Sequence, residues 1–239
     1  MKQQDLIILH GWNLSGKRFD PLTRELKKLG FRIFAPDFPG FGEEPAPDTA
    51  WHVADYAHFL NAYIKKNNIK KPVLVGHSFG GRVALKFAEL YPAMVDKLVL
   101  TGTPGFSPIP SPKLKFFLFI SKIGGIVFML PGLKSAADKA RKWLYYIAGA
   151  REFLRAEGSM RQTFKYIVSD DLVASMNSVC VPCMLVWGEL DTIVPVAIAK
   201  RMEAQINSAI LTVIPGADHG VPFREAKQFT AEISKFLLG

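Results

Sequence analysis

The sequence predicts an α/β protein with a mostly parallel, doubly wound sheet of about six strands. Short β-rich runs alternate with longer helix-like stretches along the 239-residue chain, which is typical of right-handed βαβ units. Several of these runs are continuously apolar, as at residues 73–75 and 98–100, and such runs suit strands that helices cover on both faces. The composition, 49% hydrophobic and 21% charged, is that of a globular protein and excludes a disordered chain.

The expected elements alternate in order along the chain. The first part gives three strand and helix pairs, at residues 6–9 and 17–29, 32–35 and 51–67, and 73–76 and 82–90. A fourth strand is expected at residues 97–101. After a long interruption the pattern resumes with a strand at residues 184–187 and a helix at 196–206. A strand at residues 211–214 and a closing helix at 224–238 follow. The sheet is therefore expected to have six strands.

The interruption, residues 105–177, differs in character from the rest. It opens among four prolines, Pro104, Pro108, Pro110 and Pro112, and then becomes aromatic and helix-like without a clear strand. We interpret it as a helical cap inserted into a core domain made of residues 1–104 and 178–239. A cap between two strands usually covers the site at their carboxyl ends.

The positive charge is concentrated in this segment. Residues 105–177 hold eleven Lys and Arg against five Asp and Glu, which accounts for +6 of the formal net charge of +9. A basic segment is most often a solvated face, and weak interfacial contact with anionic lipid is the alternative. Residues 114–133 are apolar, but Lys115, Lys122 and Pro131 argue against a membrane span. No nucleic-acid-binding motif is visible, so nucleic acid is not an expected partner.

We expect no metal and no cofactor. Cys180 and Cys183 have CxxC spacing, but they lie at the entry to an apolar strand, and no second Cys or His pair completes a metal site. The first apolar run, residues 6–9, is too short for the core of a secretory signal. The expected location is the cytoplasm.

The segment Gly-His-Ser-Phe-Gly-Gly at residues 76–81 predicts a nucleophile elbow with Ser78 at its tip. Gly76 and Gly80 lie two residues on either side of the serine, where a Cβ is expected to meet the other arm of the turn. Ser78 itself is expected in a strained backbone conformation. An ordinary glycine-rich loop is the alternative, which the flanking strand and helix disfavour.

A serine nucleophile needs a base and an acid that orients the base. His219 lies in a loop just past the last strand and is the expected base. The other histidines are expected elsewhere: His52 and His58 on a helix, His10 in a buried hydrogen bond, and His77 with its side chain turned away from Ser78. Asp191 follows a strand and completes the order Ser, Asp, His, although it could also cap a helix. Glu189 is the rival acid.

We expect the oxyanion to accept hydrogen bonds from the backbone N–H groups of Phe79 and Trp12. Gly11 would let the backbone of the loop after the first strand, which carries Trp12, approach the substrate closely. The expected pocket residues are Trp12, His10, Phe116, Phe117, Phe128, Trp143, Tyr146 and Val194. These side chains indicate an apolar acyl or aromatic substrate group, although aromatic residues of a cap can equally be core.

Taken in order, these motifs resemble the α/β-hydrolase superfamily over nearly the whole chain. The resemblance rests on residues 10–12, Asp-Phe-Pro-Gly-Phe-Gly at 37–42, the elbow, residues 188–195 and His219. It begins at what is usually the third strand of the family, so the customary N-terminal hairpin is expected to be missing. The loop after Gly42 reads Glu-Glu-Pro, where many relatives carry a serine.

The resemblance implies hydrolysis of a carboxylic ester with a small to medium apolar acyl or aromatic group, a small-molecule substrate. A serine at the nucleophile position argues against branches similar to haloalkane dehalogenases and epoxide hydrolases, which need a carboxylate there. Cleavage of a carbon–carbon bond in a ring-fission diketone is an alternative, disfavoured because Gly220 stands where such relatives often carry an aromatic residue. Lactone hydrolysis, a slow-turnover ligand receptor and a membrane-associated scaffold also stay open.

Overall fold

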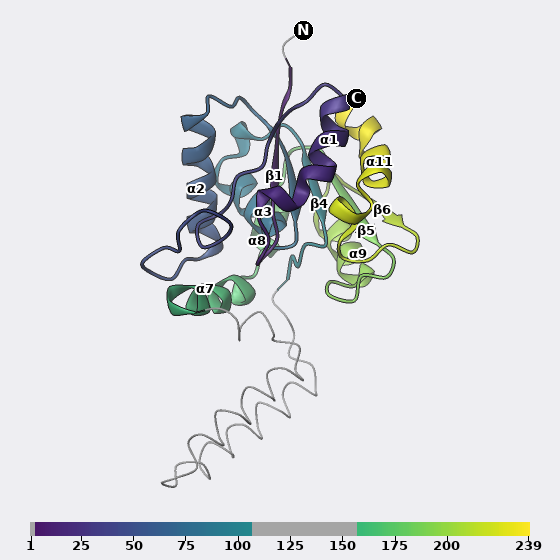
Figure 1. Ribbon diagram of the computed structural model, residues 1–239. Coiled ribbons are helices and arrows are strands. Elements are labelled where there is room, and N and C mark those ends of the chain that lie inside the picture. Colours follow the sequence, from purple (N-terminus) through teal and green to yellow (C-terminus); the bar gives the residue numbers. More distant parts are fainter. Residues whose placement is uncertain (1–2, 107–156) are drawn as a thin grey trace, which may run out of the picture.

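A parallel sheet of six strands, in the order β2-β1-β3-β4-β5-β6, forms the centre of the protein (Figure 1). The structure is a computed structural model that describes residues 3–106 and 157–239. The strands are β1 (Asp5–Leu9), β2 (Arg32–Phe34), β3 (Val73–His77), β4 (Leu98–Thr101), β5 (Cys183–Gly188) and β6 (Ala209–Ile214). The expected sheet of about six strands is confirmed.

Helices cover both faces of the sheet, so it is doubly wound as expected (Figure 1). Strand residues alternate between two apolar cores: Leu6 and Ile8 pack in one core, and Ile7 and Leu9 pack in the other. The first core is closed by α1 (Asp20–Lys28) and α11 (Ala226–Leu238), and the second by α2 (Val53–Lys66), α3 (Phe79–Leu90) and α9 (Val196–Gln205). Because both faces of the strands are buried, the strand sequences are continuously apolar.

The direction of winding reverses at β1, which pairs with β2 on one side and β3 on the other. In open α/β sheets, a crevice forms at the carboxyl ends of the strands at such a switch point, and ligands bind there. The loop that begins at His10 follows β1, and Ser78 follows β3. The topology therefore brings these two loops to one edge of the sheet.

Several boundaries differ from those expected. The first helix is preceded by a 3-10 turn, η1 (Gly16–Phe19), because Pro21 lies in the first turn of α1 and starts a new helix there. The closing helix is divided into α10 (Val221–Arg224) and α11, which meet at Glu225. A further 3-10 turn, η2 (Pro92–Met94), follows α3. None of the helices in the described ranges combines the length and the apolar character that a membrane span requires.

The described end of the expected cap is helical and packs on the core. It contains α7 (Gly158–Ser169) and α8 (Val173–Asn177). Ser159 Oγ donates to the carbonyl of Pro47 over 2.5 Å, and Thr163 Oγ1 accepts from the N–H of Trp51 over 2.9 Å. These bonds fix α7 against the segment that leads into α2. Residues 107–156, which include Phe116, Phe117, Phe128, Trp143, Tyr146 and the apolar stretch 114–133, lie outside the described residues.

Candidate active site

Ser78 lies between the last residue of β3 and the first residue of α3, in a conformation that few residues adopt. Its φ is 52° and its ψ is −114°. The N–H of Ser78 donates to the carbonyl of Thr101 over 2.9 Å, and its own carbonyl accepts from the N–H of Gly81 over 3.1 Å. Bonds to β4 and to the first turn of α3 therefore hold the strained residue in place.

Two glycines make room for this turn, for different reasons. A Cβ on Gly76 would lie 2.6 Å from the Cα of Gly81, so the two arms of the turn do approach each other there. A Cβ on Gly80 would instead lie 2.1 Å from the carbonyl oxygen of Leu9 in β1. The expectation for Gly80 was therefore wrong in its cause: the neighbouring strand, not the other arm of the turn, excludes a side chain.

His219 is hydrogen bonded to Asp191 through Nδ1 and Oδ2, which are 2.7 Å apart. The Asp191 side chain is 1% exposed and that of His219 is 15% exposed. The second carboxylate oxygen, Oδ1, accepts from the backbone N–H groups of Ile193 and Val194 over 2.9 Å and 2.8 Å. With a carboxylate oxygen as its acceptor, Nδ1 carries the proton, and Nε2 of His219 is left as a proton acceptor.

The rival acid does not contact His219 in this arrangement. Glu189 Oε2 accepts from the N–H of Gly216 over 2.9 Å, and Glu189 is exposed. Two other histidines lie on α2 or at its start: Nδ1 of His58 is 2.6 Å from the hydroxyl of Tyr91, and His52 stacks on Tyr166. Neither of these two lines the cavity described below.

His10 is buried and holds two loops together. Its Nε2 accepts from the N–H of Phe38 over 2.9 Å, so its Nδ1 carries the proton that is donated to the carbonyl of Gly11 over 2.8 Å. Burial lowers the pKa of His10 below its ordinary value, which favours the neutral ring that both bonds require. The structure thus gives His10 structural hydrogen bonds, and His10 is not among the residues that line the cavity described below.

A cavity of about 350 Å³ brings Ser78 and His219 together. Its lining includes two expected residues of the loop after β1, Gly11 and Trp12. It also includes residues that come shortly after Asp191 and His219 in the sequence. The lining residues are Gly11, Trp12, Leu14, His77, Ser78, Thr192, Ile193, Asp218, His219, Gly220, Phe223 and Arg224. Val194 is 5% exposed and packs in the core, while its neighbour Ile193 reaches the cavity.

Several lining residues were not expected from the sequence: Leu14, His77, Thr192, Ile193, Asp218, Phe223 and Arg224. Phe223 and Arg224 stand one helical turn after His219, because α10 begins directly behind the histidine loop. Their short distance in sequence from His219, four and five residues, is the feature of the sequence that could have indicated a place in the cavity wall. Arg224 pairs with Asp218, whose Oδ1 accepts from the N–H of Gly220 over 2.7 Å.

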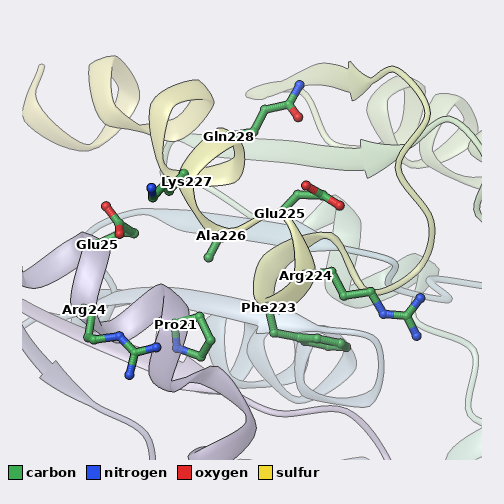
Figure 2. Close-up of a pocket in the computed structure, with 9 residues that line it drawn as sticks. All are labelled: Pro21, Arg24, Glu25, Phe223, Arg224, Glu225, Ala226, Lys227 and Gln228. Carbon is green, nitrogen blue, oxygen red and sulfur yellow. The ribbon is translucent and has the colours of Figure 1, made fainter.

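A second hollow, of about 500 Å³, lies between α1 and the start of α11 (Figure 2). It is lined by Pro21, Arg24, Glu25 and residues 223–228. Only Phe223 and Arg224 are shared with the first cavity. This hollow is larger but contains neither Ser78 nor His219, so the candidate chemistry belongs to the smaller cavity.

The described residues hold no group of three or more His, Cys, Asp or Glu side chains that could bind a metal ion. Cys180 is exposed and Cys183 is buried, and both are free. Burial raises the pKa of the Cys183 thiol to about 12, so this thiol is a poor nucleophile at neutral pH.

Comparisons with known proteins agree with this architecture. A Bacillus subtilis (strain 168) protein named AB hydrolase superfamily protein YisY is 26% identical over 245 residues, which cover 97% of this chain and 90% of that protein. A 2-hydroxy-6-oxononadienedioate/2-hydroxy-6-oxononatrienedioate hydrolase from Pseudomonas sp is 26% identical over 246 residues, 95% of this chain and 83% of that protein. The structure of an esterase from Exiguobacterium antarcticum superposes with a TM-score of 0.75 at 22% identity, covering 100% of this chain and 93% of that chain. The model of the alpha/beta hydrolase family matches residues 6–233, and the chain therefore belongs to the alpha/beta hydrolase family.

Proposed function

We propose that this alpha/beta hydrolase cleaves carboxylic esters of small to medium apolar acyl or aromatic substrates through Ser78, His219 and Asp191. The observation that carries the proposal is the 2.7 Å bond between Asp191 Oδ2 and His219 Nδ1. This bond orients a histidine that lines the same cavity as a serine with a φ of 52°. Nucleophile, base and orienting acid are the parts that an activated serine requires.

In the proposed reaction, Ser78 Oγ attacks the acyl carbon while Nε2 of His219 takes the hydroxyl proton. The imidazolium that forms lies against the buried Asp191 carboxylate, which stabilises it and keeps the proton on Nδ1. The same Nε2 then gives its proton to the departing alcohol, and Ser78 holds the acyl group as an ester. A water molecule activated by His219 attacks that ester, and the acid leaves with Ser78 restored.

Two backbone N–H groups are proposed to stabilise the oxyanion. Phe79 is the first residue of α3, and the first N–H groups of a helix have no acceptor within the helix and lie at its positive end. Trp12 is in the turn after β1, which the bond from the N–H of Leu14 to the carbonyl of Gly11 closes over 3.2 Å. Each such donor contributes about 3–4 kcal/mol to catalysis when it is tested by removal.

The apolar part of the cavity wall supports an apolar substrate group. Leu14, Ile193 and Phe223 line it together with Trp12. The Trp12 ring is held by edge contacts with Phe41 and with Phe164 of α7, at centroid distances of 4.8 Å and 5.0 Å. The described end of the cap segment therefore supports the wall of the cavity, which is consistent with a role of residues 105–177 in substrate selection.

Carbon–carbon bond cleavage is the second candidate, because the Pseudomonas relative bears the name of such a hydrolase. The position after His219 favours ester hydrolysis. A Cβ on Gly220 would lie 2.8 Å from Nε of Arg224 and 2.9 Å from the Phe223 ring. An aromatic side chain there would require the side chains of Arg224 and Phe223 to shift, so the lining as it stands suits glycine rather than the aromatic residue that is frequent in ring-fission hydrolases.

The test is turnover of p-nitrophenyl esters from acetate to decanoate, with a ring-fission diketone in parallel. We expect saturable ester hydrolysis that Ser78→Ala abolishes, and an adduct on Ser78 by mass spectrometry after treatment with a fluorophosphonate. Faster turnover of the diketone would favour the second candidate. A folded protein that hydrolyses no ester and forms no adduct would contradict the triad itself and favour a ligand receptor or a scaffold.

A further inference from the structure

His77 is a buried histidine that the proposed reaction does not use. It is the last residue of β3, directly before Ser78, and is 2% exposed. Its Nε2 lies 2.9 Å from the backbone oxygen of His219, and the two rings are 4.8 Å apart. A carbonyl oxygen only accepts, so Nε2 of His77 carries the proton and donates it.

The surroundings of His77 keep this tautomer neutral. Its Nδ1 is buried and has no hydrogen-bond partner among the residues that the structure describes, and a Cβ on Gly11 would lie 2.9 Å from it. The ring packs against Phe19 and Phe223 at centroid distances of 5.8 Å and 5.5 Å. Burial, with the neighbouring His219 as a second cause, lowers the pKa of His77 to about 3. A protonated Nδ1 would have no acceptor here.

We infer that His77 is a positioning residue that fixes the main chain of the base loop relative to the nucleophile. This inference rests on the proposed function. Asp191 orients the ring of His219, and the N–H of Leu190 holds the start of the base loop by donating to the carbonyl of Ala217 over 2.8 Å. Among the described residues, the bond from His77 is the one that reaches the carbonyl of His219 itself. His77 is joined to Ser78 by a peptide bond and to His219 by a hydrogen bond, so one short path connects nucleophile and base.

The neutral state of His77 is part of this role. During the proposed reaction His219 becomes an imidazolium, and a second positive charge 4.8 Å away would oppose that step. A neutral N–H donor holds the loop without adding a charge. A lysine or arginine at this position would supply a donor but would add a charge.

Three substitutions at His77 distinguish the effect of losing its hydrogen-bond donor from the effect of losing the volume of its ring. His77→Phe keeps a ring between Phe19 and Phe223 and removes the donor. His77→Gln places an amide N–H the same number of bonds from Cβ as Nε2, and His77→Asn places it one bond closer. We expect kcat for p-nitrophenyl butyrate to fall ~10- to 100-fold in His77→Phe and His77→Asn, with KM within ~3-fold, and to recover to within ~5-fold of wild type in His77→Gln. His58→Phe, on the exposed side of α2, is the matched control and should retain activity.

A second measurement does not depend on turnover. The proton between Nδ1 of His219 and Asp191 should give a downfield NMR signal in the resting protein. We expect the signal to persist in His77→Gln and to broaden or disappear in His77→Phe at the same temperature, with circular dichroism unchanged. Full activity and an unchanged signal in His77→Phe would overturn the inference, as would equal losses in His77→Gln and His77→Phe. If the wild type hydrolyses no ester but the signal responds as expected, the proposed function fails while the positioning role stands.

Discussion

The carboxylate of Asp191 and the imidazole of His219 form the buried hydrogen bond of the candidate site, at 2.7 Å between Oδ2 and Nδ1. In the loop between β5 and α9, the N–H groups of Ile193 and Val194 donate to the other carboxylate oxygen of Asp191, Oδ1, and so fix its position. Glu189, two residues earlier, instead accepts from Gly216 on the outside of the same region. This difference in position, rather than a difference in chemistry, distinguishes the two carboxylates.

Removal of any member of the triad should nearly abolish ester hydrolysis. We expect Ser78→Ala and His219→Ala each to lower kcat by on the order of 10⁶, and Asp191→Asn by on the order of 10⁴, because the three groups act as a unit. Glu189→Gln is the matched control and should stay within ~3-fold of wild type. Steady-state kinetics with p-nitrophenyl butyrate measure these changes. A larger loss in Glu189→Gln than in Asp191→Asn would assign the acid role to Glu189.

Much of the fold and the geometric core of the site could be predicted from the sequence. The apolar strands and the order of Ser78, Asp191 and His219 are local patterns, and a parallel sheet necessarily brings the carboxyl ends of its strands to one edge. Local sequence patterns did not predict which residues form the cavity wall. Ile193, Phe223 and Arg224 reach the cavity because of how the loop after β5 and helix α10 turn, and periodicity carries no information on those turns.

The role of Gly80 shows the same limit within the elbow itself. The motif indicates that a small residue is needed at this position, but not which atoms exclude a larger one. The contact with the Leu9 carbonyl depends on the pairing of β1 beside β3, which is a tertiary feature. Short-range sequence patterns therefore predicted the residue type correctly and its physical cause incorrectly.

Gly80→Ala should therefore destabilise the fold much more than an alanine at an open glycine. The new Cβ would lie 2.1 Å from a backbone oxygen of the central sheet, which cannot move without displacing β1. We expect a loss of about 3 kcal/mol or more in the free energy of unfolding. Gly30→Ala is the matched control: Gly30 has a φ of 90° and open space around it, so only backbone strain of about 1–2 kcal/mol applies. Urea unfolding compares the two, and equal losses would rule out the clash with β1.

Arg82 should stabilise the fold by joining segments on either side of residues 105–169. It is 2% exposed on α3, and its guanidinium donates to the carbonyls of Pro104 and Asp170. Burial lowers its pKa to about 10, so it stays charged at neutral pH. We expect Arg82→Met to lower the free energy of unfolding by about 2 kcal/mol, because two carbonyls lose their donor. Arg82→Lys should recover only part of this, since an ammonium group lacks the fork of a guanidinium.

The control for Arg82 is Arg24→Met on α1, where the arginine is exposed and should contribute within ~0.5 kcal/mol. Urea titrations at neutral pH measure all three variants. An Arg82→Met protein as stable as the wild type would show that the cost of burying the guanidinium cancels its two bonds.

Ile193 should tune the preference for acyl chain length. It lines the cavity and is 70% exposed, so its truncation removes apolar wall without opening the core. We expect Ile193→Ala to lower the ratio of kcat/KM for the hexanoate ester to that for the acetate ester by ~5-fold, the size of effect that a few methyl groups produce. Leu190→Ala is the matched control, because Leu190 is 58% exposed in the same loop and outside the cavity lining. An unchanged ratio in Ile193→Ala would show that the acyl group binds elsewhere.

The buried neutral state of His77 should make the protein less stable in mild acid. The pKa of His77 is lowered from 6.5 to about 3, so the unfolded chain binds a proton there between these values and the native protein does not. Stability is therefore fully present above pH 6.5 and is lost as the pH falls towards 3. From pH 7 to pH 4.5 this one group should remove about 2–3 kcal/mol.

Glutamine cannot titrate, so His77→Gln should lose less stability over the same pH interval, by about that amount. Burial also lowers the pKa of His10. His10 therefore contributes to the acid loss of stability in both proteins, and its contribution cancels when the two are compared. Urea unfolding of wild type and His77→Gln at pH 7 and pH 4.5 gives the four free energies needed. Equal acid losses in the two proteins would mean that His77 is not neutral in the native state, because only a group that binds its proton on unfolding can produce this difference.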